Sequence, residues 1–107
     1  MAEYLITPDA EADLAALAAQ LENAFGPLVA ESKIARIEEV FERLAAHPEL
    51  GRRRGDLAPV LRGFPVNPNL VFYRITSPGL VEIARVVDGR CDLPALLSPE
   101  RSSEPEP

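Results

Sequence analysis

A glycine–proline pair at positions 26 and 27 separates two stretches whose apolar residues recur three and four residues apart. That spacing is typical of one face of an α-helix. The stripe before the break consists of Leu14, Leu17 and Leu21, and the stripe after it consists of Ala30, Ile34, Ile37, Phe41 and Leu44. Because the break is so short, the two helices are predicted to form an antiparallel hairpin.

Residues that favour helix ends mark the limits of both helices. Residues 3–7 are β-prone and predict a strand. Pro8 then suits the first helical turn, and Thr7 suits the capping position before it. The second helix is predicted from about residue 27 to residue 46, because His47 precedes a proline and is pushed out of helical geometry.

Three further strands are predicted after a loop at residues 48–59. They span residues 60–66, 70–76 and 80–87. A Ser-Pro-Gly turn joins the last two strands as a β-hairpin. The order β-α-α-β-β-β predicts an α+β fold, in which an N-terminal strand and a helical hairpin pack on a small antiparallel sheet.

The domain is predicted to span residues 1–97, with a short final turn at residues 93–97. Residues 98–107 are rich in proline, serine and glutamate, so we expect a disordered acidic tail there.

Arginines stand in the last two strands at positions whose neighbours on the same face are apolar. In the last strand the predicted face consists of Val81, Ile83, Arg85 and Val87. A charged residue on such a face is unusual for a purely structural strand, so Arg74 and Arg85 are candidates for a binding surface. The alternative for Arg85 is an ion pair with Glu82 or Asp88 that holds the sheet together.

The charge of the chain is unevenly distributed. The net charge is −6, which argues against a nucleic-acid surface over the whole protein. Residues 1–50 hold ten acidic and three basic side chains, whereas residues 51–97 hold seven arginines and four acidic side chains. The second half is therefore locally basic. From charge alone, its arginines could equally be ordinary solvated or ion-paired groups.

Several function classes are disfavoured by composition. No run of apolar residues is long enough to span a membrane, and the start of the chain lacks a secretory pattern, so we expect a cytoplasmic protein without a membrane partner. Cys91 is the only cysteine and His47 the only histidine. We therefore predict no internal disulfide, no metal site and no cofactor.

Three segments, at their spacing along the chain, resemble the ParE branch of the RelE/ParE toxins of bacterial toxin–antitoxin systems. They are AHPELGR at residues 46–52, LVFYRI at residues 70–75 and RVVDGRCDL at residues 85–93. The resemblance extends over nearly the whole chain to Leu97. The family commonly has histidine where this chain has Asp88, which places a negative charge beside Arg85 and Arg90.

The resemblance implies one of two activities. ParE-like members bind DNA gyrase, and RelE-like members cut messenger RNA on the ribosome with basic residues and a proton-transfer group. Such cleavage needs a general acid or base near the phosphate. No tyrosine of the chain lies after the last strand, and His47 lies at a helix end. We therefore predict no catalytic residue and a gyrase-binding toxin, with the ribonuclease as the alternative.

The arginines of the sheet and the segment after it are the expected contacts with the target, since arginine is a favoured interface residue. The candidates are Arg62, Arg74, Arg85, Arg90, Asp92 and Leu93.

The resemblance also implies a ParD-like antitoxin, which would form a hetero-oligomer with this chain and occupy a groove between the hairpin and the sheet. The antitoxin-binding candidates are Leu17, Leu21, Ile34 and Phe41. The alternative is that these residues form the core, because amphipathic stripes usually face inward. We expect no sequence-specific nucleic-acid binding by this chain alone. A further alternative is a non-toxic member that acts in an autoregulatory complex with its antitoxin.

Overall fold

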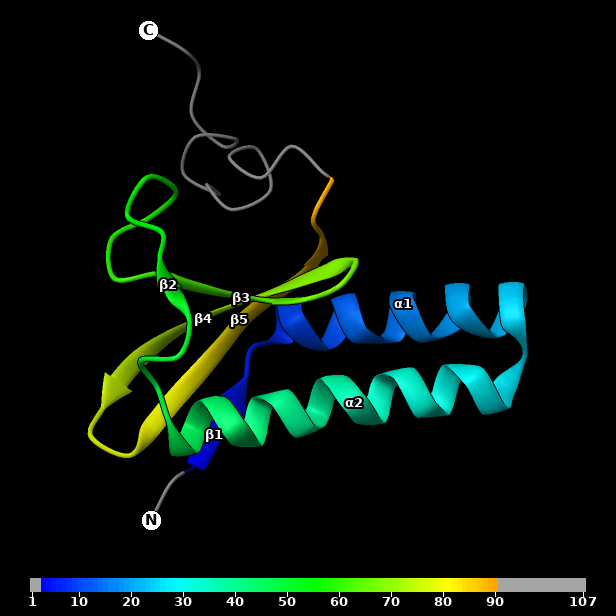
Figure 1. Ribbon diagram of the computed structural model, residues 1–107, viewed down its shortest axis with the longest axis horizontal. Helices are drawn as coiled ribbons and strands as arrows, with labels where there is room; N and C mark the ends of the chain where they lie inside the picture. The colour runs from blue at the N-terminus through cyan, green and yellow to red at the C-terminus, as the bar shows by residue number, and fades with distance from the viewer. Residues whose placement is uncertain (1–2, 91–107) are drawn as a thin grey trace, which may run out of the picture.

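The computed structural model describes residues 3–90 and has the predicted β-α-α-β-β-β order, with one additional two-residue strand (Figure 1). The elements are β1 (Glu3–Ile6), α1 (Pro8–Phe25), α2 (Pro27–Ala46), β2 (Arg52–Arg53), β3 (Arg62–Val66), β4 (Asn69–Ser77) and β5 (Leu80–Asp88). The α+β fold class is therefore confirmed. The predicted turn at residues 93–97 and the tail at residues 98–107 lie outside the described residues.

The five strands form one sheet in the order β1-β5-β4-β3-β2. The pairs β3–β4 and β4–β5 are antiparallel, as predicted, and β2, which was not predicted, is antiparallel to β3. In contrast, β1 pairs with β5 in parallel, with Tyr4 opposite Val81. The sheet is thus mixed. This arrangement follows from the path of the chain, because the helical hairpin carries it from the β1 edge of the sheet to the β2 edge (Figure 1).

The turn residues act as the sequence predicts. Thr7 caps α1, because its hydroxyl accepts a hydrogen bond from the Ala10 N–H at 3.1 Å and donates one to the Ala84 carbonyl at 3.0 Å. Gly26 lies between the two helices with φ of 92°, a backbone conformation that side chains with a Cβ rarely adopt. These two residues fix where the hairpin begins and where it reverses.

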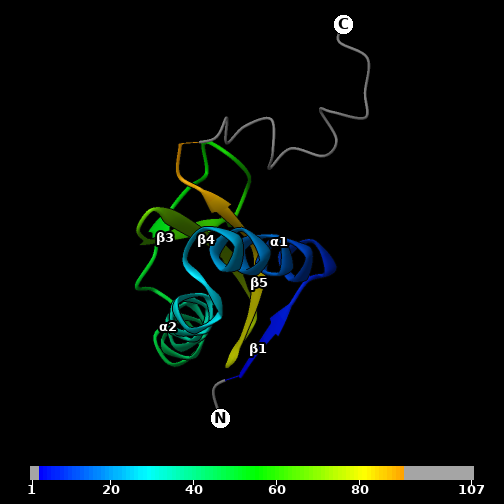
Figure 2. The same ribbon diagram turned by 90° about the vertical axis from the view of Figure 1, so that its right-hand side faces the viewer.

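The main core lies between the hairpin and one face of the sheet. Its buried members are Ala10, Ile37, Val40, Phe41, Leu44, Val71, Tyr73, Val81, Ile83 and Val86. Most of the buried helix residues belong to the second half of α2. The hairpin therefore packs on the sheet through the start of α1 and the end of α2, and its closed end projects beyond the sheet (Figures 1 and 2).

A smaller cluster covers the opposite face of the sheet. It consists of Leu61, Phe72, Ala84 and Val87, with Leu57, Ala58 and Leu70 packed against it. The segment between β2 and β3 thus supplies part of the cover. The Arg54 guanidinium lies 5.9 Å from the centre of the Phe72 ring and is held in place by two hydrogen bonds to Asp56.

An irregularity in the pairing of β4 with β5 corrects the predicted faces of the last strand. Tyr73 lies opposite Ile83, but Phe72 lies opposite Arg85, so Ala84 is an extra residue in β5. A bulge of this kind changes the phase of the alternation. As a result, Val86 contacts the main core and Val87 contacts the smaller cluster, whereas strict alternation placed Val87 with Ile83.

Candidate functional site

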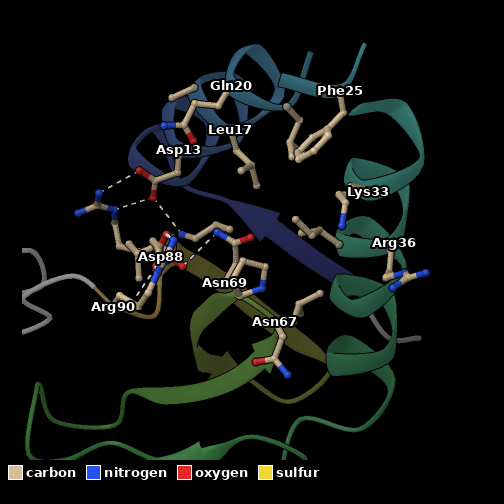
Figure 3. Close-up of a pocket in the computed structure, with 18 residues that line it drawn as sticks. Asp13, Leu17, Gln20, Phe25, Lys33, Arg36, Asn67, Asn69, Asp88 and Arg90 are labelled. Carbon is tan, nitrogen blue, oxygen red and sulfur yellow. Dashed lines mark hydrogen bonds and ion pairs between the residues drawn. The ribbon is translucent and has the colours of Figure 1, made fainter. Parts of the chain in front are cut away.

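A groove of about 520 Å³ lies between the helical hairpin and the sheet (Figure 3). We call it the helix–sheet groove. One wall comes from α1, the second from α2, and the third from the β3–β4 turn and the end of β5. The residues that line it include Asp13, Leu17, Leu21, Phe25, Lys33, Arg36, Ile37, Val66, Asn67, Asn69, Arg85, Val86, Asp88 and Arg90.

The groove combines apolar walls with basic residues at its margins. Leu17 and Leu21 are half-buried, and the Phe25 side chain at the end of α1 is 63% exposed. On the other helix, Lys33 and Arg36 stand on the wall of the groove and are both exposed (Figure 3). The groove is therefore locally basic and partly apolar on a protein whose net charge is −6.

Asp13 of α1 joins the helix to the open edge of β5. Its carboxylate accepts hydrogen bonds from Arg85 Nε at 2.7 Å, from Arg85 Nη2 at 2.9 Å and from the Val86 N–H at 2.9 Å. Because β1 ends at Ile6, none of the described strands covers β5 at this level, and the Asp13 side chain accepts the hydrogen bond of the Val86 N–H instead. The hydrogen bonds that Arg85 donates to Asp13 raise the pKa of Arg85.

The predicted ion-pair partners of Arg85 are therefore wrong. Glu82 pairs with Arg74 at 3.4 Å, and Asp88 pairs with Arg90 at 2.7 Å. The partner of Arg85 comes from a helix 72 residues earlier in the chain, and both side chains are largely buried, with 22% and 15% exposed.

Asp88 and Arg90 form a second ion pair at the end of β5. The Asp88 carboxylate accepts hydrogen bonds from the Arg90 side chain at 2.7 and 2.9 Å and from the Arg90 N–H at 2.8 Å. These hydrogen bonds lower the pKa of Asp88 to about 2. The negative charge that distinguishes this position is thus compensated by the next arginine in the chain.

The structure does not gather the described target-binding candidates into one patch. Arg85 and Arg90 lie at the groove, whereas Arg74 lies elsewhere on the sheet with Glu82. Arg62 lies on β3 and donates a hydrogen bond from Nη1 to the Gly51 carbonyl at 2.8 Å. The two remaining candidates, Asp92 and Leu93, lie outside the described residues.

The antitoxin-binding candidates also differ in position. Leu17 and Leu21 line the groove, Ile34 is half-buried on α2, and Phe41 is fully buried in the main core. Phe41 therefore stabilises the fold and presents no surface. Lys33 and Arg36 were not among the predicted site residues. The available signal was the position of Lys33, four residues before Ile37 and three before Arg36, since residues three and four apart lie near one another on a helix.

Tyr73 anchors the segment after α2 to the sheet. Its buried hydroxyl donates a hydrogen bond to the Pro48 carbonyl at 2.6 Å and accepts one from the Gly51 N–H at 2.8 Å. Burial raises the pKa of Tyr73. Gly51 must be a glycine here, because a Cβ would lie 2.6 Å from the Tyr73 hydroxyl oxygen. The hydroxyl is therefore committed to backbone groups.

Two general features complete the description of residues 3–90. Within this range, no three His, Cys, Asp or Glu side chains are arranged to hold a metal ion. Neither of the two described helices is long and apolar enough to cross a membrane.

Comparisons with known proteins agree with one another. Residues 4–93 match the family model described as the ParE toxin of type II toxin–antitoxin system, parDE. Toxin ParE3 of Caulobacter vibrioides is 50% identical over 72 residues, which cover 67% of this chain and 71% of that protein. Toxin ParE1 of Mycobacterium tuberculosis is 29% identical over 90 residues, which cover 84% of this chain and 92% of that protein.

A solved structure shows the same fold. It is described as the chromosomal ParDE TA system from P. aeruginosa, and the match has a TM-score of 0.71 at 23% identity. The match covers 82% of this chain and 96% of that one.

Proposed function

The chain belongs to the ParE toxin family of type II toxin–antitoxin systems, and we propose that it inhibits DNA gyrase by binding and is neutralised by a ParD-like antitoxin in the helix–sheet groove. The observation that carries the second part is the chemistry of the groove. Its leucines offer apolar contact, and its exposed lysine and arginine offer positive charge. The occupant that fits is an amphipathic segment with acidic side chains.

The described tyrosines and histidine favour binding over RNA cleavage. The Tyr73 hydroxyl is hydrogen-bonded to backbone at both sides, and the Tyr4 ring packs against Phe41 with ring centres 5.5 Å apart. His47 caps the end of α2. A general acid or base must reach the reacting group, and none of these three side chains is placed in the groove with Arg85 and Arg90.

The target is tested first by pulse-labelling of DNA and protein synthesis in bacteria, minutes after induction of this chain without antitoxin. We expect DNA synthesis to fall first and purified chain to inhibit gyrase supercoiling at micromolar concentration. An early fall in protein synthesis with intact supercoiling would overturn the gyrase proposal and favour the ribonuclease.

The groove is tested by charge reversal. Arg36→Glu is expected to weaken binding of the ParD-like antitoxin roughly tenfold or more, because a repulsive charge at an interface is costly. Growth inhibition by the chain alone should stay unchanged. Arg43→Glu is the matched control, because it changes the net charge of the chain by the same amount. Arg43 is exposed and lies two helical turns further along α2, outside the groove. Equal binding by both variants would contradict the groove proposal.

A further inference from the structure

A second hollow lies at the end of the sheet away from the helix–sheet groove. Its volume is about 330 Å³, and it is lined by Arg53, Gly55, Val60, Leu61, Arg62 and Ile75. We call it the β2 notch. Two of its aliphatic side chains are unusually exposed for their size, Val60 at 75% and Ile75 at 40%. Aliphatic side chains exposed together in a hollow are typical of protein-binding surfaces.

The two arginines of the notch lie directly opposite each other. Arg53 of β2 pairs with Arg62 of β3 in the antiparallel register. Like charges in this position repel each other. Neither arginine forms an ion pair with a carboxylate of residues 3–90, whereas Arg54, Arg74, Arg85 and Arg90 each do. The notch therefore has two positive charges that the described part of the chain does not neutralise.

Arg62 is nevertheless held in place. Its Nη1 donates to the Gly51 carbonyl at 2.8 Å, and Gly51 is itself bound to the Tyr73 hydroxyl. The guanidinium thus has a fixed position without a carboxylate partner among residues 3–90. A fixed cation loses little conformational freedom when a carboxylate binds it, which favours tight binding.

Val60 adds an observation from the backbone. Its φ is 55°, the left-handed region that β-branched residues rarely adopt. Asparagine or glycine would suit this turn better, and either would remove the exposed aliphatic side chain. The fold alone gives no reason for valine here, whereas a partner that contacts the valine does.

The notch and the groove are far apart along β4. Asn69 lines the groove and Ile75 lines the notch, and six residues of strand at about 3.3 Å each separate them by roughly 20 Å. Figure 1 shows β4 running from the β3–β4 turn near α1 to the opposite end of the sheet. An antitoxin segment in the groove therefore does not occupy the notch.

We propose that the β2 notch is the surface with which this toxin contacts its target protein. In the complex an apolar side chain of the target packs between Val60 and Ile75, and carboxylates of the target pair with Arg53 and Arg62. A protein fits better than a nucleic acid, because a phosphate backbone has no partner for the two aliphatic side chains and the chain carries a net charge of −6. The inference rests on the proposed function that the chain acts by binding a target.

The first test separates stability from activity with one substitution. Val60→Asn should raise the melting temperature, because asparagine tolerates the left-handed conformation, and should lower growth inhibition in cells by about tenfold. A purely structural residue would move stability and activity in the same direction. Leu28→Asn is the control, because Leu28 is 80% exposed at the distant closed end of the hairpin. It should leave growth inhibition unchanged.

The second test uses adjacent arginines of β2. Arg53→Glu should weaken growth inhibition roughly tenfold, and Arg52→Glu should not, although both change the net charge equally. The two side chains point to opposite faces of the strand, and both are exposed. Binding of the ParD-like antitoxin, measured by calorimetry, should stay within about twofold of the wild type for both variants.

Each contrary outcome overturns the inference in its own way. Wild-type toxicity of Val60→Asn and Arg53→Glu would show that the notch is not used. Parallel loss of antitoxin binding would assign the notch to the antitoxin, and loss of affinity for single-stranded RNA would assign it to a polyanion. Growth inhibition can be measured without knowing which protein is inhibited. If the chain fails to inhibit supercoiling, gyrase is excluded as the target, but the effect of the notch variants on growth still tests the notch. A wild-type chain without toxicity would remove both proposals.

Discussion

The two ends of the sheet use arginine in opposite ways. At the groove end, Arg85 is largely buried and shares two short hydrogen bonds with the Asp13 carboxylate. At the notch end, Arg53 and Arg62 face each other without a carboxylate among the described residues. The difference teaches that the charge of an arginine in a strand is neutralised within residues 3–90 only where a neighbouring element supplies a carboxylate.

The largest loss of stability is expected from a substitution at Gly51, which supports Arg62 at the notch end of the sheet. Gly51→Ala places a methyl group 2.6 Å from the Tyr73 hydroxyl oxygen and 2.9 Å from the Gly63 carbonyl oxygen, so the segment must shift. We expect a loss of about 3 kcal/mol in the free energy of unfolding, measured by urea denaturation. Gly55→Ala is the control, because nothing lies within 4 Å of its added Cβ. Equal stability of both variants would contradict the close packing at Gly51.

A smaller loss is expected when the groove end is broken. Asp13→Ala removes the carboxylate that accepts hydrogen bonds from the Arg85 guanidinium and the Val86 N–H, and should cost about 2 kcal/mol of stability. The double variant Asp13→Ala with Arg85→Gln should be less destabilised than the sum of the single variants, because the two side chains contact each other directly and each single variant already breaks that contact. Strict additivity in urea denaturation would argue that the pair is not coupled.

A still smaller loss of stability is expected when the Tyr73 hydroxyl, which anchors the segment next to the notch, is removed. Tyr73→Phe loses the hydrogen bonds with the Pro48 carbonyl and the Gly51 N–H, and should cost about 1 kcal/mol. The ring stays in place, so the notch should loosen without collapse. Tyr4→Phe, measured by the same denaturation, serves as the reference, because the Tyr4 ring also packs against the core. An equal loss in the free energy of unfolding for Tyr4→Phe would contradict the role of the Tyr73 hydroxyl as an anchor.

The smallest effect concerns the exposed ion pair at the groove margin. The folded pKa of Asp88, about 2, lies below the ordinary value of about 3.9. The stabilising contribution of Asp88 is therefore present above about pH 4 and is lost as the pH falls toward 2. Arg90→Gln should raise this pKa toward the ordinary value, as followed by carboxylate chemical shifts in an NMR titration. Titration of Asp88 near pH 4 in the wild type would contradict the pairing.

Local patterns predicted most of the fold. The bounds of α2 match the prediction of residues 27–46, and the Thr7 cap is confirmed, because helix periodicity and end residues act over a few positions. The parallel pairing of β1 with β5 and the Ala84 bulge were not predicted. Both depend on contacts between segments far apart in sequence, and spacing along one strand carries no information about them.

The site was predicted less completely for the same physical reason. Leu17 and Leu21 came from the helical stripe and do line the groove. The partner of Arg85 lies on another element, so the sequence offered only the nearby acids Glu82 and Asp88 as alternatives. The run of arginines after α2 was interpreted as a loop, since a strand as short as Arg52–Arg53 forms only because β3 lies beside it.

The parallel pair of β1 and β5 has a consequence for the moment at which the toxin becomes active. Residues 3–6 can take their place in the sheet only after residues 80–83 exist, and the main core contains both strands. At typical translation rates, the first strand waits about 4–15 s for its partner, which lies 77 residues further along the chain. The helical hairpin can form locally in that interval, but the finished sheet cannot. Synthesis thus delivers an active fold only near its end, when antitoxin already present can meet it.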